Sequence, residues 1–242
     1  MKRFVLLLVP ILARAADPTP RVAVLAELFT SEGCSSCPSA DALLMKLDKL
    51  QPVPGAQIVV LSEHVDYWNS LGWTDPYSSQ QFTQRQVMYA RTLHGDEPYT
   101  PQLVIDGRVA FVGSNQNEIL PALAKEAALP KTAVKIASAK RDGKDAVVNV
   151  SVGASSSKAE VWVAIADDHD QSSVRKGENS GKTLDHVAVV RSLTKIGTTP
   201  KAKGFEKEVR IPITTQAGPM RVVVFVAESG GPVLGTAIQE LP

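Results

Sequence analysis

This sequence of 242 residues has only two cysteines and almost no net charge, with a formal value of +1 at pH 7. Two cysteines are too few for a small domain held together by several disulfides. A near-neutral charge argues against a dedicated nucleic-acid partner, because proteins that bind nucleic acids carry basic surfaces. The sequence shows no tandem repeat and no low-complexity tract. These absences favour an ordinary globular chain of one or two domains.

The N-terminus carries the features of a secretory signal peptide. Lys2 and Arg3 precede an apolar run from Phe4 to Leu12, and Ala13–Ala15 forms an A-x-A cleavage site. This run is too short for a membrane span, which needs about 20 apolar residues. We therefore expect residues 1–15 to be removed and the mature chain to be secreted or periplasmic, with no membrane span after cleavage.

Residues 21–130 alternate strand-like and helix-like segments in the order β-α-β-α-β-β-α. Strands that alternate with helices indicate parallel pairing, and an Asp-Gly pair between apolar runs is a strong hairpin signal. The expected elements are strands at 22–29 and 58–61, helices at 38–50, 75–93 and 115–129, and two strands joined by Asp106-Gly107.

Residues 131–242 have a different pattern. Short alternating runs rich in Val, Thr and Ser are separated by Gly, Pro and Asp-Gly. This pattern is typical of a mostly antiparallel β-sandwich, here of Ig-like size. Residues 167–197 are long for a loop, and the run "DHVAVVRSL" within them predicts a further strand.

Both cysteines lie in "GCSSCP", residues 33–38, where the first strand ends and the first helix begins. Unpaired N–H groups and the helix dipole stabilise an anion at a helix start. Cys34 is therefore expected to ionise more easily than a free cysteine. Because a thiolate is the species that attacks a disulfide, Cys34 is the predicted attacking thiol and Cys37 the resolving thiol.

Two other uses of the cysteine pair remain open. A structural clip gains little, since the chain-entropy estimate of about 3 kcal/mol applies to a 15-residue loop and a four-residue loop yields less. Structural zinc needs four ligands, but copper(I) accepts two thiolates with a third ligand. The alternative function is thus a copper- or protein-binding module, with Cys34, Cys37 and His64 as metal ligands or with a resting disulfide.

A second motif, Tyr99-Thr100-Pro101, stands at the start of the third strand. With the element order and the CxxC at a helix start, it resembles the thioredoxin fold. The resemblance implies that Pro101 follows a cis peptide bond and packs beside the CxxC, with Thr100 before it. It also implies an acid in the first strand that accepts a proton, and Glu27 is the residue for that role. Gly33 stands where thioredoxins commonly carry a tryptophan.

Longer stretches extend the resemblance over nearly the whole mature chain. They are similar to a bacterial secreted family with a thioredoxin-like domain (domain of unknown function, the twelve-twenty-three family). The similarity implies an α/β thioredoxin-like domain at 21–130 followed by the β-sandwich domain at 131–242, and it implies no substrate. The stretches are "ELFTSEGCSSCPSAD", "HVDYWNSLGWTDPYSS", "RQVMYA", "YTPQLVIDG" and "GENSGKTLDHVAVVR".

Three further groups are candidates for the site. His64 ends the second strand, near the CxxC edge of a parallel sheet, where it either relays a proton or is hydrogen-bonded within a loop. The aromatic residues Tyr67, Trp68 and Trp73 either edge a groove for an extended peptide or belong to the core. In the second half, Glu178, His186 and Arg191 either form a catalytic site or lie in a solvated loop that braces the domain interface.

The sequence therefore predicts an exported thiol–disulfide oxidoreductase-like protein. Its site would comprise Cys34, Cys37, Thr100 and Pro101, with Glu27 and His64 as accessory residues. Its partners would be protein or peptide thiols and disulfides, and its redox-active disulfide would need no added cofactor.

Overall fold

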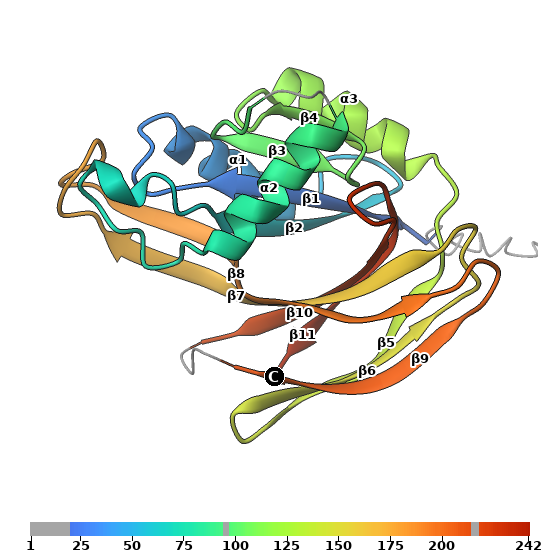
Figure 1. Cartoon of the computed structure of the whole chain (residues 1–242). Helices are drawn as coiled ribbons and strands as arrows, with labels where there is room; N and C mark the ends of the chain where they lie inside the picture. Colours follow the sequence, from blue (N-terminus) through green and yellow to red (C-terminus); the bar gives the residue numbers. More distant parts are fainter. Residues whose placement is uncertain (1–19, 94–96, 214–217) are drawn as a thin grey trace, which may run out of the picture.

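The computed structural model describes residues 20–93, 97–213 and 218–242, so the predicted signal peptide at 1–15 lies outside the described residues. Its elements form a mixed α/β fold with one large sheet and one small sheet (Figure 1). They are β1 (Val22–Thr30), α1 (Cys37–Leu50), β2 (Ala56–His64), η1 (Asn69–Leu71), α2 (Gln80–Leu93), β3 (Gln102–Ile105), β4 (Val109–Val112), α3 (Gln116–Ala127), β5 (Val134–Asp142), β6 (Asp145–Val152), β7 (Ala159–Ser173), β8 (Thr183–Thr199), β9 (Phe205–Pro212), β10 (Met220–Ala227) and β11 (Val233–Leu241).

The first half has the predicted order of strands and helices. Strands β1 and β2 pair in parallel along their whole length, and β3 pairs antiparallel with β1 and with β4. Asp106 and Gly107 turn the β3–β4 hairpin with φ angles of 44° and 60°. Two successive residues with positive φ are what the centre of a type I′ turn requires, and the Arg108 N–H donates to the Ile105 carbonyl at 3.0 Å to close this turn. The Asp-Gly hairpin prediction is therefore confirmed.

One predicted helix boundary is wrong. The second helix begins at Gln80, not at Asp75. Asp75 instead starts a turn in which its carbonyl accepts the Ser78 N–H at 3.2 Å and its carboxylate accepts the Tyr77 N–H at 2.9 Å. An Asp-Pro pair resembles a helix start, but here the carboxylate serves contacts outside any helix.

The strands of the second half are distributed over both sheets. Strands β5, β6 and β9 form the small sheet, whereas β7, β8, β10 and β11 extend the large one, whose order among the described residues is β11-β10-β7-β8-β2-β1-β3-β4. The strand predicted from "DHVAVVRSL" is part of β8. Ser62 of β2 pairs in parallel with Val189 of β8. Strands from both halves of the chain therefore share one continuous sheet.

The helices are placed on opposite faces of this sheet (Figure 1). Alternate residues of β1 from Val24 to Leu28 pack against α1 and α3. The intervening residues, from Leu25 to Phe29, lie in the clusters on the α2 face. Because side chains alternate along a strand, Glu27 faces α2 and lies on the opposite face from α1.

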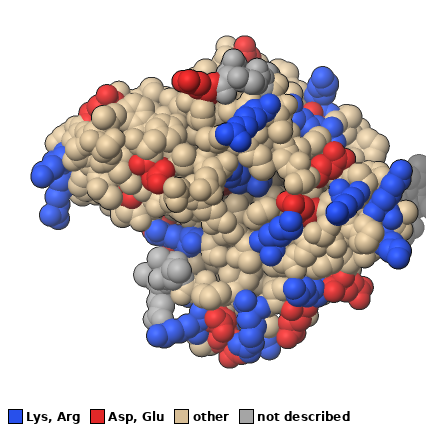
Figure 2. Space-filling view, viewed as in Figure 1, with Lys and Arg blue, Asp and Glu red and all other residues tan. Residues whose placement is uncertain are grey.

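A third core lies between the two sheets, where apolar residues of β5, β6 and β9 pack against β7, β10 and β11. On the face shown in Figure 2, Lys and Arg side chains are interspersed with Asp and Glu, and the upper left part is mostly uncharged. Within the described ranges, no helix has the length and apolar character that a membrane crossing requires.

Candidate functional site

The CxxC segment forms a closed loop between β1 and α1. Cys34 and Cys37 are joined by a disulfide, and both residues are 0 % exposed. The Cys34 N–H donates to the Ser31 carbonyl and the Cys37 N–H donates to the Cys34 carbonyl, each at 3.2 Å. Helix α1 begins at Cys37, with proline in its first turn, so the disulfide spans the loop and the first helical residue.

The segments around Thr100 and Trp68 flank this loop. The Thr100–Pro101 peptide bond is cis, as the resemblance implied. Trp68 Nε1 donates to Thr100 Oγ1 at 2.8 Å. A Cβ atom added at Gly33 would lie 3.1 Å from Trp68 Cβ, so the chain approaches the tryptophan closely at this glycine. The cysteine loop, Trp68 and the Thr-Pro segment thus form one packed unit.

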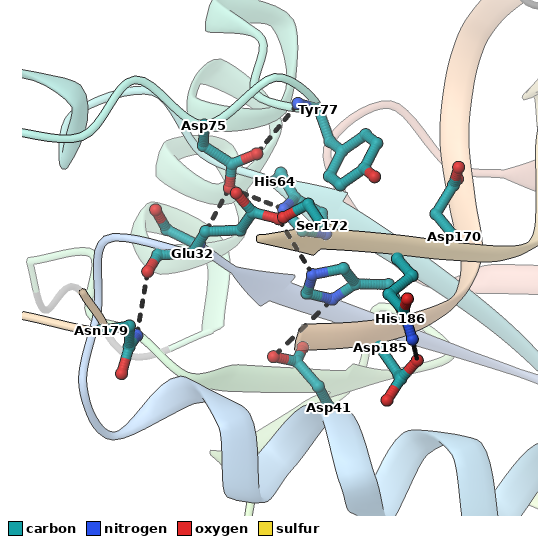
Figure 3. Close-up of polar contacts among 12 residues, drawn as sticks. Glu32, Asp41, His64, Asp75, Tyr77, Asp170, Ser172, Asn179, Asp185 and His186 are labelled. Carbon is teal, nitrogen blue, oxygen red and sulfur yellow. Dashed lines mark hydrogen bonds and ion pairs between the residues drawn. The ribbon is translucent and has the colours of Figure 1, made fainter. Parts of the chain in front are cut away.

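A group of buried acids and histidines, Glu32, Asp41, His64, Asp75 and His186, lies beside the cysteine loop (Figure 3). We call it the acid–histidine cluster. Glu32 is its hub: its N–H donates to Asp75 Oδ2 at 2.8 Å, and its carboxylate accepts bonds from Trp73 Nε1 at 2.7 Å and from the Ser172 hydroxyl. The cluster thus joins the cysteine loop to β7 and β8 of the second half.

His186, on β8, lies between two carboxylates of the first half. Its Nε2 is 3.3 Å from Glu32 Oε1 and its Nδ1 is 3.9 Å from Asp41 Oδ2. Its ring also meets the His64 ring edge to face, with centroids 4.7 Å apart. One imidazole from the second half therefore bridges the acid before the CxxC and the acid within α1.

His64 and Asp75 form a fully buried pair. His64 Nδ1 lies 2.7 Å from Asp75 Oδ2. Burial alone would lower the pKa of His64, but the charge and hydrogen bond of Asp75 raise it above the usual value. Burial would likewise raise the pKa of Asp75, and His64 lowers it below the usual range. The pair is therefore most strongly held when His64 is protonated and Asp75 is ionised.

Asp41 shares the buried stripe of α1 with Cys37 and Leu44. Residues four apart on a helix have Cβ atoms about 5–6 Å apart, and Cα–Cβ bonds tilt toward the helix N-terminus. The Asp41 side chain is therefore directed toward the turn that carries Cys37. Burial raises the pKa of the Asp41 carboxyl, an effect that His186 and His64 oppose. Asp41 is thus a buried, titratable carboxyl group one helical turn from Cys37.

Three polar atoms of the acid–histidine cluster are buried without a hydrogen-bond partner in the described part of the chain. They are Asp41 Oδ1, His64 Nε2 and His186 Nδ1. Such atoms are uncommon, because an unmet buried donor or acceptor costs about 1–3 kcal/mol. Three such atoms beside residues with shifted pKa values are features often found at functional sites.

The three candidates from the second half, Glu178, His186 and Arg191, contact residues of the first half. Glu178 Oε2 accepts the Ser35 N–H at 2.9 Å, and His186 belongs to the acid–histidine cluster. Arg191 lies farther along β8, where its Nε donates to Asp167 at 2.6 Å and its guanidinium covers the Tyr77 ring at 4.5 Å. Two of the three candidates are thus brought to the cysteine loop, and Arg191 contacts the rim of the cluster.

Glu27 is not brought to the cysteines. It lies on the α2 face of the sheet, where its carboxylate accepts bonds from Arg85 Nε at 2.6 Å and from the Tyr89 hydroxyl at 2.7 Å. Its partners therefore make it part of a separate buried ion pair. The structure instead places Glu32, Asp41 and Glu178 near the CxxC.

The metal alternative finds no ready-made ligand set. No group of three or more His, Cys, Asp or Glu residues with the geometry to hold a metal ion occurs in residues 20–93, 97–213 and 218–242. The two sulfur atoms are bonded to each other, and His64 Nδ1 is engaged with Asp75.

Four residues of the site were missed from the sequence: Glu32, Asp41, Asp75 and Asn179. Asp41 had a detectable signal, because a carboxylate on the apolar stripe of a helix is an informative exception. Glu32 stands only two residues before Cys34, but acids are common in loops. Asn179 and Asp75 could be found only from the tertiary pairing of β2 with β8 and from the turn after β2.

The fold and the site define a mixed α/β protein whose CxxC disulfide lies at the start of a helix, beside buried acids and histidines. Residues 25–227 match the family described as "Protein of unknown function (DUF1223)". The chain belongs to this family, which confirms the resemblance of the longer sequence stretches to the family of unknown function.

A solved structure supports the same fold. Protein AGR_C_4864 from Agrobacterium tumefaciens is 29% identical, with 92% of this chain and 95% of that chain covered and a TM-score of 0.68. Spo0M, a sporulation control protein from Bacillus subtilis, is 9% identical over 46% of this chain and 47% of that chain, with a TM-score of 0.30. A TM-score that low carries no argument. The comparison with curated proteins found no match.

The His64–Asp75 pair predicts a dependence of stability on pH. The raised pKa of His64 contributes stability that is present below about pH 6.5 and is lost as pH rises through the folded-state value. In Asp75→Asn, the largest effect that raises the pKa of His64 is lost. Burial still lowers this pKa, and only the acids Glu32 and Asp41 oppose it. The contribution of His64 to the slope above pH 6 is therefore expected to shrink or reverse.

Denaturant unfolding at several pH values between 5 and 8 measures this slope for both proteins. His169→Gln is the control, since the His169 side chain is 62% exposed. An unchanged slope in Asp75→Asn would contradict a folded state in which the pair is ionised.

Proposed function

We propose that this protein exchanges disulfides with protein or peptide thiols, with Cys34 as the sulfur that forms the mixed disulfide and Cys37 as the resolving sulfur. One observation carries the proposal: the CxxC disulfide lies at a helix start, one helical turn from the buried acid Asp41, whose carboxylate lies 3.9 Å from His186 Nδ1. A disulfide that serves only as a clip has no use for a proton carrier on its own helix face.

The proposed exchange begins when a substrate thiolate attacks Cys34 Sγ. The Cys34–Cys37 bond breaks, its electron pair leaves on Cys37 Sγ, and Asp41 gives that thiolate a proton. A second substrate thiolate then attacks the substrate sulfur in the mixed disulfide and releases Cys34 as a thiolate. The substrate dithiol becomes a disulfide and the protein becomes a dithiol, a transfer of two electrons. The reverse sequence reduces a substrate disulfide.

The proposal keeps the wider expectations from the sequence. Residues 21–130 are proposed to act as a thioredoxin-like domain and residues 131–242 as a β-sandwich domain that supplies His186, Glu178 and Asn179 to the site. The chain is proposed to work in a secreted or periplasmic setting, where disulfides persist. Its proposed partners are protein thiols and disulfides rather than nucleic acid.

A second candidate function is favoured by one observation, the complete burial of both cysteines. On that view the CxxC is a resting disulfide and the protein is a binding module. The two candidates differ in whether the sulfur atoms ever react with a partner.

Replacing Cys37 with alanine is expected to trap mixed disulfides between Cys34 and substrate proteins in an exported fraction. Without the resolving thiol, the bond between Cys34 and a substrate cannot be released by the neighbouring sulfur. Non-reducing electrophoresis with mass spectrometry detects the adducts, and a reductant should remove them.

Cys34→Ala is the matched control, because its remaining cysteine is the resolving one. Adducts with Cys37→Ala and none with Cys34→Ala support exchange. No adduct with either variant, together with no oxidation of a synthetic peptide dithiol by the intact protein, rejects exchange in favour of the resting disulfide.

A further inference from the structure

The buried disulfide poses a problem of access. An incoming sulfur must reach Cys34 Sγ to form a mixed disulfide, and exchange rates depend on that access. In the structure both cysteines are 0 % exposed, whereas Ser35 and Ser36 between them are exposed. If the protein exchanges disulfides with other proteins, a segment that covers the sulfur atoms has to move.

The loop Val174–Lys182, which joins β7 to β8, contacts the cysteine segment directly. Its Asn179 side chain donates to the carbonyls of Glu32 and Cys34, both at 2.9 Å. Its Glu178 carboxylate accepts the Ser35 N–H at 2.9 Å. In Figure 1 the β7–β8 connection lies at the same end of the molecule as the segment after β2. Two adjacent side chains therefore fasten this loop to the CxxC.

Outside these two side chains, the loop contacts the rest of the chain through the buried Val174 and through Gly177, which approaches Trp73 closely. Apart from Val174 and Asn179, all its residues are exposed, and segments with few buried contacts open at low free-energy cost. Gly177 and Gly181 have φ angles of 76° and 83°, values that glycine adopts readily. By contrast, Trp68 on the other flank packs against the core cluster of Phe29 and Tyr89.

We propose that the Val174–Lys182 loop is a redox-responsive cover of the cysteine pair, seated on the disulfide form by Glu178 and Asn179 and released on reduction. This inference rests on the proposed exchange function and adds its regulation. Glu178 and Asn179 are positioning residues, because they act through the loop and do not contact the reacting sulfur atoms.

Charge supplies the link between redox state and cover. Bonds from the Ser35 hydroxyl and N–H hold the pKa of Glu178 below its usual value, so the carboxylate is ionised where it is seated. Reduction by a dithiol adds two electrons and one proton to the disulfide and leaves a thiol and a thiolate. A thiolate on Cys34 competes with Glu178 for hydrogen bonds from the N–H groups of this segment, and its negative charge repels the Glu178 carboxylate. Because coupling between two equilibria is reciprocal, displacement of the loop favours the thiolate by the same factor by which the thiolate favours displacement of the loop.

Hydrogen exchange of the loop tests the release. The amides of Val174, Gly181 and Lys182 are hydrogen-bonded within the loop. After reduction with a small phosphine, they are expected to exchange faster by about 5- to 150-fold, the usual range for coupled sites. The double variant Cys34→Ser/Cys37→Ser is the control, and the phosphine should leave its exchange unchanged. Equal exchange in the oxidised and reduced protein overturns the cover.

Reduction kinetics test the two fastening residues. Glu178→Gln and Asn179→Ala are expected to speed reduction by a bulky protein dithiol several-fold, and reduction by a small phosphine much less. Glu118→Gln is the matched control, because Glu118 is, like Glu178, an exposed acid, but it lies in the first turn of α3. A merely structural role would change both reductants alike, and that result would overturn the assignment.

The two proposals fail in different ways. Trapped adducts with Cys37→Ala, combined with redox-independent loop exchange, would remove the cover and keep the exchange function. A different result would remove the exchange function and keep the redox response of the loop. In that result the loop responds to reduction, but the protein forms no adducts, even when the Glu178→Gln substitution removes one of the loop's contacts.

Discussion

Replacing Arg85 with methionine is expected to lower the free energy of unfolding by about 3–5 kcal/mol, the usual cost of breaking a buried ion pair from one side. The Arg85 side chain is 6% exposed and lies 2.6 Å from Glu27 Oε1, whose residue is fully buried. Its Nε is also 3.6 Å from Glu63 Oε1. The variant leaves the buried Glu27 carboxylate and the buried Glu63 carboxyl group on the α2 face without a cation.

The chemistry around Arg85 explains the size of this effect. Burial raises the pKa of Glu63 well above its usual value, Glu27 raises it further, and only Arg85 opposes them. The guanidinium also donates to the Tyr89 hydroxyl at 2.8 Å and stacks over the Phe225 ring at 4.9 Å. Methionine restores some packing but none of these polar contacts.

Denaturant unfolding of the oxidised protein, with an unchanged m-value, measures the loss. Arg210→Met is the matched control, because Arg210 pairs with Asp142 and Asp145 at an exposed position and exposed pairs contribute little. Double replacement of Arg85 by Met and Glu27 by Gln should recover part of the loss. Equal stability of Arg85→Met and Arg210→Met would show that the buried pair is not ionised in the folded protein.

The elements of the first half could be predicted because their signals are local. The apolar run of β1, the helical spacing of α1 and the Asp106-Gly107 turn each lie within a few residues. The start of α2 was missed because the Asp75 carboxylate is used across long distances, by His64 and by the Glu32 N–H. No local pattern distinguishes a carboxylate that begins a helix from one that serves a distant histidine.

The site was predicted only in part, for a topological reason. The parallel pairing of Ser62 with Val189 brings β8 beside β2, and this pairing places His186 next to His64. Strand patterns show which segments are strands, but they do not show which strands pair across the two halves. A second-half histidine with no known catalytic spacing therefore looked like part of a solvated loop.

The place of Glu27 illustrates the same limit on a smaller scale. Because β1 is buried on both faces, its sequence is an almost continuous apolar run without alternation. The face of each side chain becomes known only when α1 and α2 are placed. Glu27 then faces Arg85, whereas Asp41 lies on the buried stripe of α1 with Cys37. We therefore propose Asp41 for the proton-accepting role that the sequence assigned to Glu27.

Replacing Asp41 with asparagine is expected to slow the step at Cys37 by about 100-fold near neutral pH, the lower end of what a positioned acid or base contributes. Asparagine keeps the size of the side chain and cannot carry the proton that Cys37 gains or loses. The burial that raises the pKa of Asp41 makes this carboxyl an effective carrier. Because Cys37 leaves as the mixed disulfide forms at Cys34, mixed-disulfide formation is the step that slows. The later release of Cys34 by the second substrate thiolate should change far less.

Stopped-flow measurements with a peptide dithiol separate the two steps, and their pH profiles separate chemistry from structure. In Asp41→Asn, the rate of the step in which Cys37 leaves should rise steadily with hydroxide concentration. In the intact protein, the pH profile of this step should show the titration of the Asp41 carboxyl. Asp48→Asn is the matched control, since Asp48 lies on the same helix and bonds Arg221 at 2.8 Å. Equal slowing of both steps, or an unchanged pH profile, would mean that Asp41 supports the helix and does not carry the proton.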